Sequence, residues 1–496
     1  MTETGAVLRD APAEADPRRW IALVVLCVGM LMIILDATVV NVALPAIQDD
    51  LGFSQSNLAW VMNAYLIAFG GLLLLAGRIG DLIGRKTIFM TGLAVFTAAS
   101  LLCGAAQSQE VLIGARFVQG VGGAMTSAVI LGMIVTMFPE PREQAKAIAV
   151  YSFVASAGAS IGLLAGGVIT QAINWHWIFL VNLPIGIATA AFAVRLIDRE
   201  KGIGLRQGAD VAGAVLVTSS LMLTVYTIVQ ASDHGFGSVR TLVLGAVALA
   251  LLGGFIAREA RTRTPLVPLR IFRSRNVSGA NLVQILMVAG LFGMFFLGAL
   301  YLQGVLGYDA IETGLAFLPV SVGIGVLSLG FSARLMERFG ERATLLPGLV
   351  LIAAGLLLFA RAPVDANYVV DVLPSMILLG VGAGVSFPAL MTLAMSGATP
   401  SDSGLASGLV NTTQQVGGAL GLAVLATLSS TRTDDLLQSG ESSASALTSG
   451  YHLAFVIGAG LVVVAFGVAA TVLRSPEVAT VTEGVPAEQP VYSEAA

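Results

Sequence analysis

The chain alternates between long apolar stretches and short polar ones. Fourteen apolar stretches reach about 18 to 25 residues, which as a helix is enough to cross a hydrocarbon core roughly 30 Å thick. They fall at about 20–45, 58–76, 87–106, 111–137, 145–171, 177–195, 211–230, 241–258, 277–303, 313–333, 343–361, 369–395, 405–429 and 452–473. The pattern predicts an all-α integral membrane protein with 14 transmembrane helices.

Composition excludes a water-soluble enzyme. Hydrophobic residues make up 56% of the 496 residues and charged residues only 11%, against about 25% charged in an ordinary soluble domain. The first apolar stretch also lacks the small-residue exit of a cleaved signal peptide, so it is expected to remain as a spanning helix. We therefore expect a multi-pass membrane protein without enzymatic activity and without catalytic residues.

Lys and Arg concentrate in alternate loops. If the N-terminus is cytoplasmic, 22 of the 26 Lys and Arg residues fall in inside segments and 3 in outside segments, while Arg116 lies within a span. Cytoplasmic loops of membrane proteins carry this kind of excess. The distribution predicts that both termini are cytoplasmic. We expect the protein to lie in the inner (cytoplasmic) membrane of a bacterial cell.

An internal repeat organises the chain. The loop from Arg78 to Lys86 places a base, an acid, a glycine and a base at the same spacing as the loop from Arg334 to Arg342, which lies 256 residues further on. Three glycines recur at nearly the same offset: Gly120 as Gly380, Gly122 as Gly382, and Gly162 as Gly418. The repeat predicts two pseudo-symmetric six-helix halves around a central cavity, with two further helices inserted between them.

The repeat divides the chain into five parts. A cytoplasmic tail (1–19) precedes the N-terminal six-helix bundle (20–195). A two-helix insert with cytoplasmic loops (196–276) joins it to the C-terminal six-helix bundle (277–474), and a disordered cytoplasmic tail (475–496) ends the chain.

Four motifs carry a resemblance to a known family. Residues 77–86 look like the signature loop of the major facilitator superfamily, and residues 35–45 are similar to a motif of its fourteen-helix drug:proton antiporter branch. Residues 116–124 match the proton-transfer motif of the superfamily, and residues 158–167 resemble its antiporter motif, except that Leu163 replaces the usual Pro. The resemblance implies the fold of this superfamily, in a 6+2+6 plan, and multidrug efflux by alternating access.

Asp36 and Arg116 are the candidate residues for proton coupling. Asp36 is the one carboxylate, and Arg116 the one base, deep within a predicted span, where ionisable groups are costly and usually functional. Counting about 1.5 Å per residue from the helix ends puts both at similar depth, so that a contact is possible. Arg116 would stabilise ionised Asp36, and its departure would favour protonation. A structural ion pair is the alternative.

The signature loop is a candidate gate on the cytoplasmic side. Its candidate residues are Gly77, Asp81, Gly84, Arg85 and Lys86. By resemblance, Asp81 would meet the N-terminal end of the helix predicted at 405–429 when this side is closed, because a helix N-terminus favours an anion. Plain positive-inside charge is the alternative for the two bases.

Small and aromatic residues complete the candidate site. Gly158, Gly162 and Gly166 recur every four residues next to Gly167, which predicts close helix packing. Polar and aromatic residues within the spans are candidates for the substrate cavity: Asn41, Trp60, Asn63, Tyr65, Asn281, Gln284, Phe292, Phe296, Asn411 and Gln414. Such a lining would suit a lipophilic small molecule.

The chain has no motif for ATP binding and no soluble domain to hold a nucleotide. The histidines His176, His234 and His452 are too scattered for a metal site, and we expect no metal, no cofactor and no nucleic acid. The partners are then a lipophilic substrate, protons and membrane lipid, the energy source is a proton gradient, and the protein is expected to function as a monomer. Two alternatives remain: a proton-coupled symporter that imports a small molecule, and a non-transporting membrane scaffold or sensor.

Overall fold

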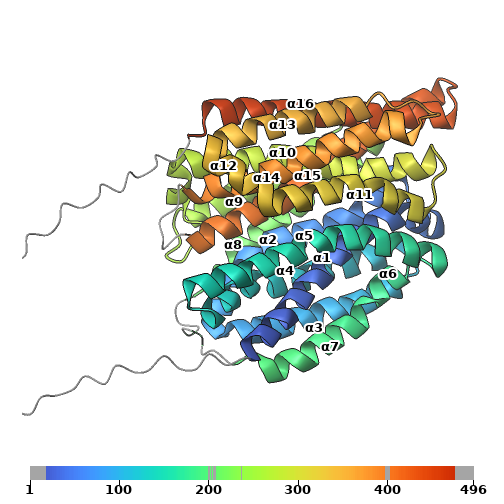
Figure 1. The fold of residues 1–496 in the computed structure, drawn as a ribbon. Helices are drawn as coiled ribbons and strands as arrows, with labels where there is room; N and C mark the ends of the chain where they lie inside the picture. Colours follow the sequence, from blue (N-terminus) through green and yellow to red (C-terminus); the bar gives the residue numbers. More distant parts are fainter. Residues whose placement is uncertain are drawn as a thin grey trace, which may run out of the picture.

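The computed structural model describes residues 18–198, 202, 204, 208–235, 237–396 and 403–474, and every regular element among them is helical. The predicted terminal tails lie outside the described residues, apart from Arg18 and Arg19. The helices run side by side in one bundle, and both ends of the described chain emerge at the same end of it (Figure 1).

The N-terminal half contains seven helical segments that form six rods. They are α1 (Arg18–Leu51), α2 (Gln55–Ile83), α3 (Arg85–Gly104), α4 (Gln109–Met137), α5 (Pro141–Ala172), and the short α6 (Trp177–Leu180) followed by α7 (Asn182–Leu196). The insert consists of α8 (Val211–His234) and α9 (Val239–Glu259), and a short 3-10 turn (Leu269–Arg273) leads to the second half.

The C-terminal half repeats the plan. Its helices are α10 (Arg275–Gly304), α11 (Ala310–Val326), which continues through a π-helical turn (Leu327–Phe331) into α12 (Ser332–Phe339), α13 (Glu341–Phe359), α14 (Leu373–Ser396) preceded by a second π-helical turn (Tyr368–Val372), α15 (Ser403–Gln438) and α16 (Ser443–Thr471).

Eleven helices of the described chain are long and apolar enough to cross a membrane. The other three predicted spans coincide with α5, α11 and α15. Helix α9 is the most outward-facing, with Val239 78% and Leu249 69% exposed, as expected for side chains that contact lipid.

Packing reproduces the internal repeat. Helix α4 crosses α2 closely at Gly120, where a Cβ would lie 2.5 Å from the carbonyl oxygen of Tyr65. Helix α14 crosses α11 in the same way at Gly380, where a Cβ would lie 2.8 Å from the carbonyl oxygen of Val320. The two halves are therefore built on one helix arrangement with equivalent contacts.

The joints between helices repeat as well. Helix α2 meets α3 at Gly84, with φ +106°, and α12 meets α13 at Gly340, with φ +84°. Residues that carry a side chain rarely adopt a positive φ of this size, whereas glycine does so freely. The two equivalent loops thus share a backbone turn that requires glycine.

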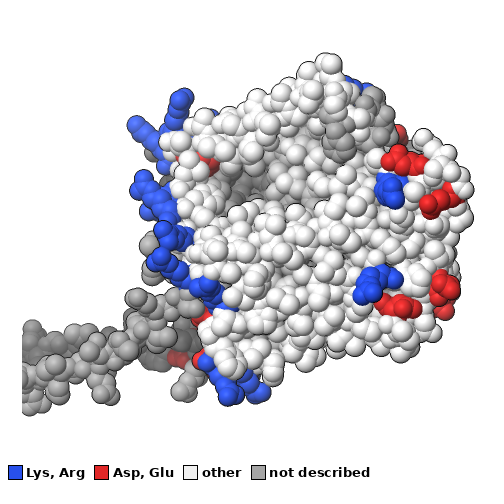
Figure 2. All heavy atoms as spheres, turned by 90° about the horizontal axis from the view of Figure 1, so that it is seen from above, with Lys and Arg blue, Asp and Glu red and all other residues white. Residues whose placement is uncertain are grey.

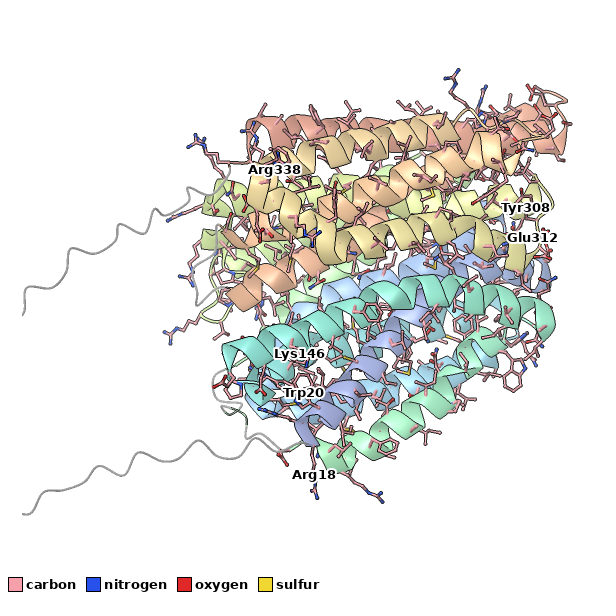
Figure 3. All side chains as sticks on the ribbon, viewed as in Figure 1. Arg18, Trp20, Lys146, Tyr308, Glu312 and Arg338 are labelled. Carbon is pink, nitrogen blue, oxygen red and sulfur yellow. The ribbon has the colours of Figure 1, made fainter. Side chains whose placement is uncertain are left out.

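Charge separates the two ends of the bundle. Figure 2 shows Lys and Arg gathered at one end, Asp and Glu with few bases at the other, and an uncharged band between. Arg18, Lys146 and Arg338 lie at the first end, and Tyr308 and Glu312 at the second (Figure 3). We call these the basic end and the acidic end; the uncharged band is the part that lipid can cover.

Candidate functional site

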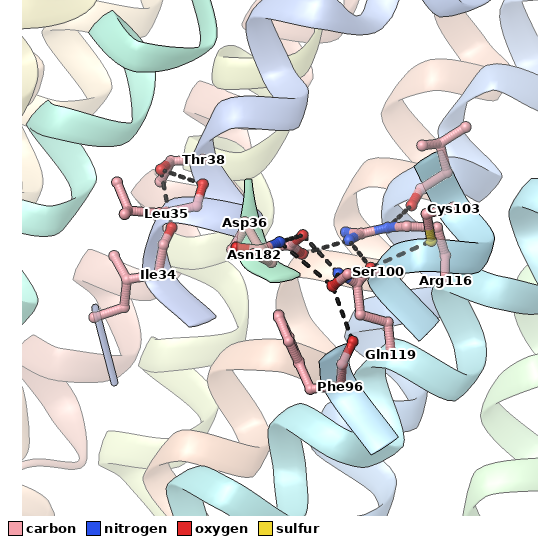
Figure 4. Close-up of polar contacts among 12 residues, drawn as sticks. Ile34, Leu35, Asp36, Thr38, Phe96, Ser100, Cys103, Arg116, Gln119 and Asn182 are labelled. Atoms are coloured by element: carbon pink, nitrogen blue, oxygen red, sulfur yellow. Dashed lines mark hydrogen bonds and ion pairs between the residues drawn. The ribbon is translucent and has the colours of Figure 1, made fainter. Parts of the chain in front are cut away.

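Asp36 on α1 and Arg116 on α4 form a fully buried ion pair. Both side chains are 0% exposed, and Nη1 of Arg116 donates to Oδ2 of Asp36 at 2.5 Å. The contact that the sequence allowed between these two helices is present (Figure 4).

Three further polar side chains surround the carboxylate. Gln119 donates to Oδ1 of Asp36 at 2.7 Å and Asn182 of α7 donates to the same oxygen at 3.1 Å. Ser100 of α3 accepts hydrogen bonds from both amides, at 2.8 and 3.4 Å. We call Asp36, Arg116, Gln119, Asn182 and Ser100 the buried polar network.

Sequence reasoning assigned no role to the last three members. Each is a polar residue within an apolar span, and Gln119 lies one turn from Arg116 on α4. Polar residues inside spans are expected to find partners there, so this signal was available. Which of the many polar span residues share a face with Asp36 could be seen only from the packing.

Arg116 is held on several sides. Its Nε donates to the carbonyl oxygen of Val61 at 2.9 Å and its Nη1 also donates to Gln119 at 2.8 Å. The guanidinium lies 4.3 Å from the ring centroid of Tyr65 and 5.7 Å from that of Phe179, within the range of a cation–π contact. The base is therefore fixed in place, and movement of Asp36 relative to it would break the pair.

The hydrogen-bond pattern around Asp36 fits the ionised form. The hydrogen bonds to its two oxygens come from the donor nitrogens of Arg116, Gln119 and Asn182, and an ionised carboxylate can only accept. A proton on Asp36 would compete with these donors for the carboxylate oxygens.

A cavity of about 870 Å³ opens between the two halves toward the basic end. Apolar side chains from α1 and α2 line one part of it, among them Met30, Ile34 and Phe69. The predicted cavity residues Asn411 and Gln414 of α15 line another part. Its volume falls in the range of small-molecule sites.

Asp36 does not line this cavity. Two residues of helix turn a side chain by about 200°, so Asp36 and the lining residue Ile34 lie on opposite faces of α1. The buried polar network is therefore behind the cavity wall, and α1, α3 and α4 each contribute residues to both.

Several predicted cavity residues lie in the helix packing instead. Asn41 donates to carbonyl oxygens of its own helix, Asn281 accepts from Thr413, and Gln284 is buried. Asn63 is also buried, and neither atom of its amide has a hydrogen-bond partner.

The aromatic residues that were predicted to line the cavity also lie elsewhere, in the helix packing or in a separate groove. Tyr65 packs on Arg116, Phe296 is fully buried in the C-terminal half, and Phe292 contacts Gly418 of α15. Trp60 lines a separate groove of about 700 Å³ between α2, α4 and the insert.

The signature loop borders the cavity at the basic end. Gly77, Asp81 and Arg85 line it, and Arg85 bonds Asp81 at 3.1 Å while it donates to the carbonyl oxygen of Gly132. Lys86 donates to the carbonyl oxygens of Val194 and Ile197 at the end of α7. Asp81 was expected to dock at the N-terminal end of α15; Leu405 and Gly408 of that end line the same cavity, while Asp81 bonds Arg85.

The four glycines of the antiporter motif have two tasks. Gly158, Gly162 and Gly166 pack α5 against α1, where a Cβ on Gly166 would lie 2.8 Å from the carbonyl oxygen of Val39. Gly167 instead faces α11, where a Cβ would lie 2.9 Å from Cα of Ile311. This last contact joins the two halves of the molecule.

Contacts near the acidic end also join the halves. Gln171 at the end of α5 donates to Asp309, which caps α11, at 2.9 Å. Gln303 of α10 donates to the carbonyl oxygen of Val42 of α1 at 2.9 Å. With these contacts made, and the large cavity at the other end, the structure is closed at the acidic end and hollow at the basic end.

No group of three or more His, Cys, Asp and Glu residues in the described chain could hold a metal ion. His452 is half-buried rather than solvated, because its ring contacts the carbonyl oxygen of Ala362 at 2.8 Å. His176 precedes α6, and the side chain of His234 lies outside what the structure describes.

The sequence model of the Major Facilitator Superfamily matches residues 26–422. A puromycin resistance protein of Streptomyces alboniger is 41% identical over 454 residues, with 89% of each chain covered. A cephamycin export protein of Amycolatopsis lactamdurans is 38% identical, over 83% of this chain and 85% of its own.

Solved structures share the fold at low sequence identity. A bacterial homologue of the human lysosomal transporter Spinster, in an inward-facing and unoccupied conformation, gives a TM-score of 0.68 at 17% identity, covering 93% of this chain and 99% of its own. The nucleoside transporter NupG gives a TM-score of 0.63 at 13% identity, with 91% and 99% covered.

Proposed function

The chain belongs to the major facilitator superfamily of membrane transporters, and from that premise we propose that it is a proton-driven antiporter that exports lipophilic small molecules, antibiotics among them, across the cytoplasmic membrane. Relatives at 41% and 38% identity are named for puromycin resistance and cephamycin export. A transporter of this superfamily is not an enzyme, and the proton gradient serves as its energy source without a cofactor.

One observation carries the proton coupling: the fully buried Asp36–Arg116 pair beside the cavity wall. A buried pair of this kind gives little stability, because desolvation of both charges offsets their attraction. It is useful where the charge on one partner changes during the working cycle. We therefore assign Asp36 as the proton carrier and Arg116 as the partner that competes with the proton.

The shared helix α1 links this proton to the substrate. Met30 and Ile34 on one face of α1 line the cavity, and Asp36 on the other face holds the buried polar network. Protonation of Asp36 releases Arg116, frees α1 to shift relative to α4, and so changes the cavity wall. Proton and substrate then compete through α1 without touching the same atoms.

The basic end is cytoplasmic in this proposal, with both termini inside. Substrate enters the cavity from the cytoplasm or the inner leaflet, and Asp36 gives its proton to that side. The halves then tilt about the α5–α11 contact, the cavity opens at the acidic end, and Asp36 takes up a proton there as substrate leaves. The protein works in this scheme as a monomer in contact with lipid.

The cavity favours neutral or singly cationic lipophilic substrates. The described carboxylates in its lining are Asp81, which Arg85 pairs, and Asp210, which Arg258 pairs. Neither of these paired carboxylates is free to balance charge on the substrate, so each added positive charge makes binding less favourable. Export of a dication as strong as that of its monovalent analogue would contradict this assignment.

The test is transport in everted membrane vesicles that contain the full-length protein. We expect puromycin or a lipophilic dye to accumulate in the vesicles when a proton gradient is imposed, and accumulation to stop when a protonophore collapses it. Substrate should also release protons from the purified protein. Proton-driven movement of substrate out of the vesicles would instead indicate the symporter. No transport of substrate, with or without the gradient, would indicate a scaffold or sensor.

A further inference from the structure

A pair of buried carboxylates lies outside the buried polar network, in the two-helix insert. Asp210 caps the N-terminus of α8 and Glu259 ends α9, so both belong to the basic end. Asp210 is 2% exposed and Glu259 is 4% exposed. Nothing in the proposed export cycle uses them.

One oxygen of each carboxyl group is satisfied. Oδ1 of Asp210 accepts from Nε of Arg258 at 2.6 Å and from the backbone N–H of Gly213 at 2.8 Å. Oε2 of Glu259 accepts from the backbone N–H of Val267 at 2.9 Å. These bonds fix the position of both groups at the junction of α8, α9 and the following loop.

The other oxygen of each group is buried without a hydrogen-bond partner. Oδ2 of Asp210 lies 2.6 Å, and Oε1 of Glu259 lies 2.9 Å, from the position that a Cβ on Gly213 would take. Both unpartnered oxygens therefore lie next to the same glycine. Two ionised carboxylates would repel there, and a buried polar atom without a partner is costly.

We propose that Asp210 and Glu259 form a proton-binding site, in which Glu259 holds the proton and donates it from Oε1 to Oδ2 of Asp210. The proton supplies the missing bond to both oxygens at once, since a protonated carboxyl group is a donor. Asp210 is the ionised member because Arg258 and a backbone N–H already stabilise charge on it.

A metal ion fits this place less well than a proton. Divalent cations such as calcium take about 6 to 8 oxygen ligands, whereas the described residues place two unpartnered carboxylate oxygens here. The guanidinium of Arg258 also supplies positive charge next to Asp210. Among the described charged side chains, Asp210 and Arg258 act on the Glu259 carboxyl group.

The site is in reach of the cytoplasm and of the gate. Asp210 borders the large cavity together with Arg78, Asp81 and Arg263, so protons can arrive by that route. Arg78 of the signature loop region donates to the carbonyl oxygen of Gly208 at 3.3 Å, two residues before Asp210.

Gly204, which like Gly208 belongs to the linker between α7 and α8, also contacts the end of α2. The backbone N–H of Gly204 donates to the carbonyl oxygen of Leu82 at 3.0 Å. The bound proton holds the start of α8 on α9 and thereby holds the linker against α2. Loss of the proton at higher cytoplasmic pH loosens this contact, so the insert acts as a sensor of cytoplasmic pH on the gate.

Infrared spectroscopy of the purified full-length protein tests the proton site without any need for transport. The wild type should show the C=O band of a protonated carboxyl group that disappears as the pH is raised. Glu259→Gln should lack this band, because its amide replaces the proton by donating to Asp210. Asp36→Asn and the surface variant Glu312→Gln should keep it.

A single cysteine at position 83, at the end of α2, tests the link to the gate. In the detergent-solubilised wild type, thiol labelling of Ile83→Cys should rise several-fold with pH beyond the rise at Ser439→Cys, which corrects for thiol ionisation. In the Glu259→Gln background this excess should vanish. The regulation rests on the proposed export, whereas the proton site does not.

Several outcomes would overturn the proposal. A wild-type protein without the infrared band, or Glu259→Gln with the band unchanged, would show that this pair shares no proton. A labelling excess that is absent in the wild type, or that persists in Glu259→Gln, would remove the link to the gate. Loss of the band in Asp36→Asn would assign the proton to the buried polar network instead.

Discussion

The two six-helix halves share a backbone arrangement, but they place side chains of opposite character at equivalent buried positions. In the N-terminal half, α1 and α4 meet through Asp36 and Arg116. At the equivalent positions of the C-terminal half lie Phe292 to Phe296 on α10 and Met376 on α14, and both Phe296 and Met376 are fully buried. One half buries charge where its copy buries hydrocarbon.

The aromatic core of the C-terminal half shows what packing alone can provide. Phe359 stacks on Phe455 with ring centroids 4.7 Å apart and meets the edge of Tyr301 at 5.6 Å. Such contacts need no charge and do not depend on pH. Since the described residues of this half pack apolar side chains where the other half has its ion pair, the fold does not require charge at this position, and the Asp36–Arg116 pair calls for a functional explanation.

The largest expected effect comes from removing the charge at Asp36. Asp36→Asn keeps the shape of the side chain but cannot titrate, so export against a gradient and substrate-induced proton release should both be lost, while substrate binding is retained. Met376→Leu in the other half is the control and should export normally. Uphill export with proton release by Asp36→Asn would show that another residue carries the proton.

The next effect is on stability. Arg116→Met leaves a buried carboxylate without its partner, which costs about 3–5 kcal/mol of unfolding free energy. The double variant Asp36→Asn/Arg116→Met removes both charges and should regain most of that stability without regaining export. Chemical unfolding in detergent measures the three proteins, and equal stability of the single and double variants would contradict the comparison.

A substitution at the equivalent buried position of the C-terminal half should cost far less unfolding free energy. Met376→Leu conserves volume in a fully buried apolar position, and swaps of this kind usually cost below about 1.5 kcal/mol. Its proton release should match the wild type. If this variant no longer coupled export to proton release, the C-terminal half would take part in proton transfer.

Labelling with an impermeant thiol reagent tests the orientation on which the comparison depends. The two native cysteines, Cys27 and Cys103, are buried, so introduced cysteines can be read individually. In intact cells, cysteine at Ser108 or Ser439 should react and cysteine at Ser274 should not. Reaction at Ser274 would reverse the assignment of the basic end to the cytoplasm.

The smallest effect concerns Asp309, a titratable group at the acidic end of the C-terminal half. Hydrogen bonds from the backbone N–H of Glu312 and from Gln171 hold the pKa of Asp309 below its usual value. Its stabilising contribution is therefore complete above the ordinary pKa of about 3.9 and is lost as the pH falls through the lower folded value.

Asp309→Asn checks this expectation through the pH dependence of unfolding. In mildly acidic to neutral solution the variant and the wild type should respond to pH alike, because Asp309 stays ionised. In strong acid the wild type should lose stability more steeply than the variant. A difference that arises near neutral pH would contradict the direction of the shift.

The architecture followed from the sequence because it depends on local signals. Apolar length gave the spans, and the repeated Gly84 and Gly340 marked two equivalent turns that both have positive φ. The similar depth of Asp36 and Arg116 followed from counting residues along two helices, since the rise per residue is fixed.

The cavity could not be predicted in the same way, because it depends on which face of each helix meets a neighbour. Asn411 and Gln414 line it, but Asn281 and Gln284 of α10 point into the packing. Neighbouring positions on a helix look alike in the sequence when both faces are apolar. For the same reason Asn182 escaped notice, although it contacts Asp36.

The contact between α5 and α11 has a kinetic consequence. At Gly167 and Gly314 backbone lies on backbone, with a Cβ on Gly314 only 2.7 Å from the carbonyl oxygen of Leu163. The two glycines themselves present no side chain at these points, so sliding there meets fewer rotamer barriers. We expect the halves to reorient quickly once they are free to do so, which leaves the opening of the Asp36–Arg116 pair as the slow step of each turnover.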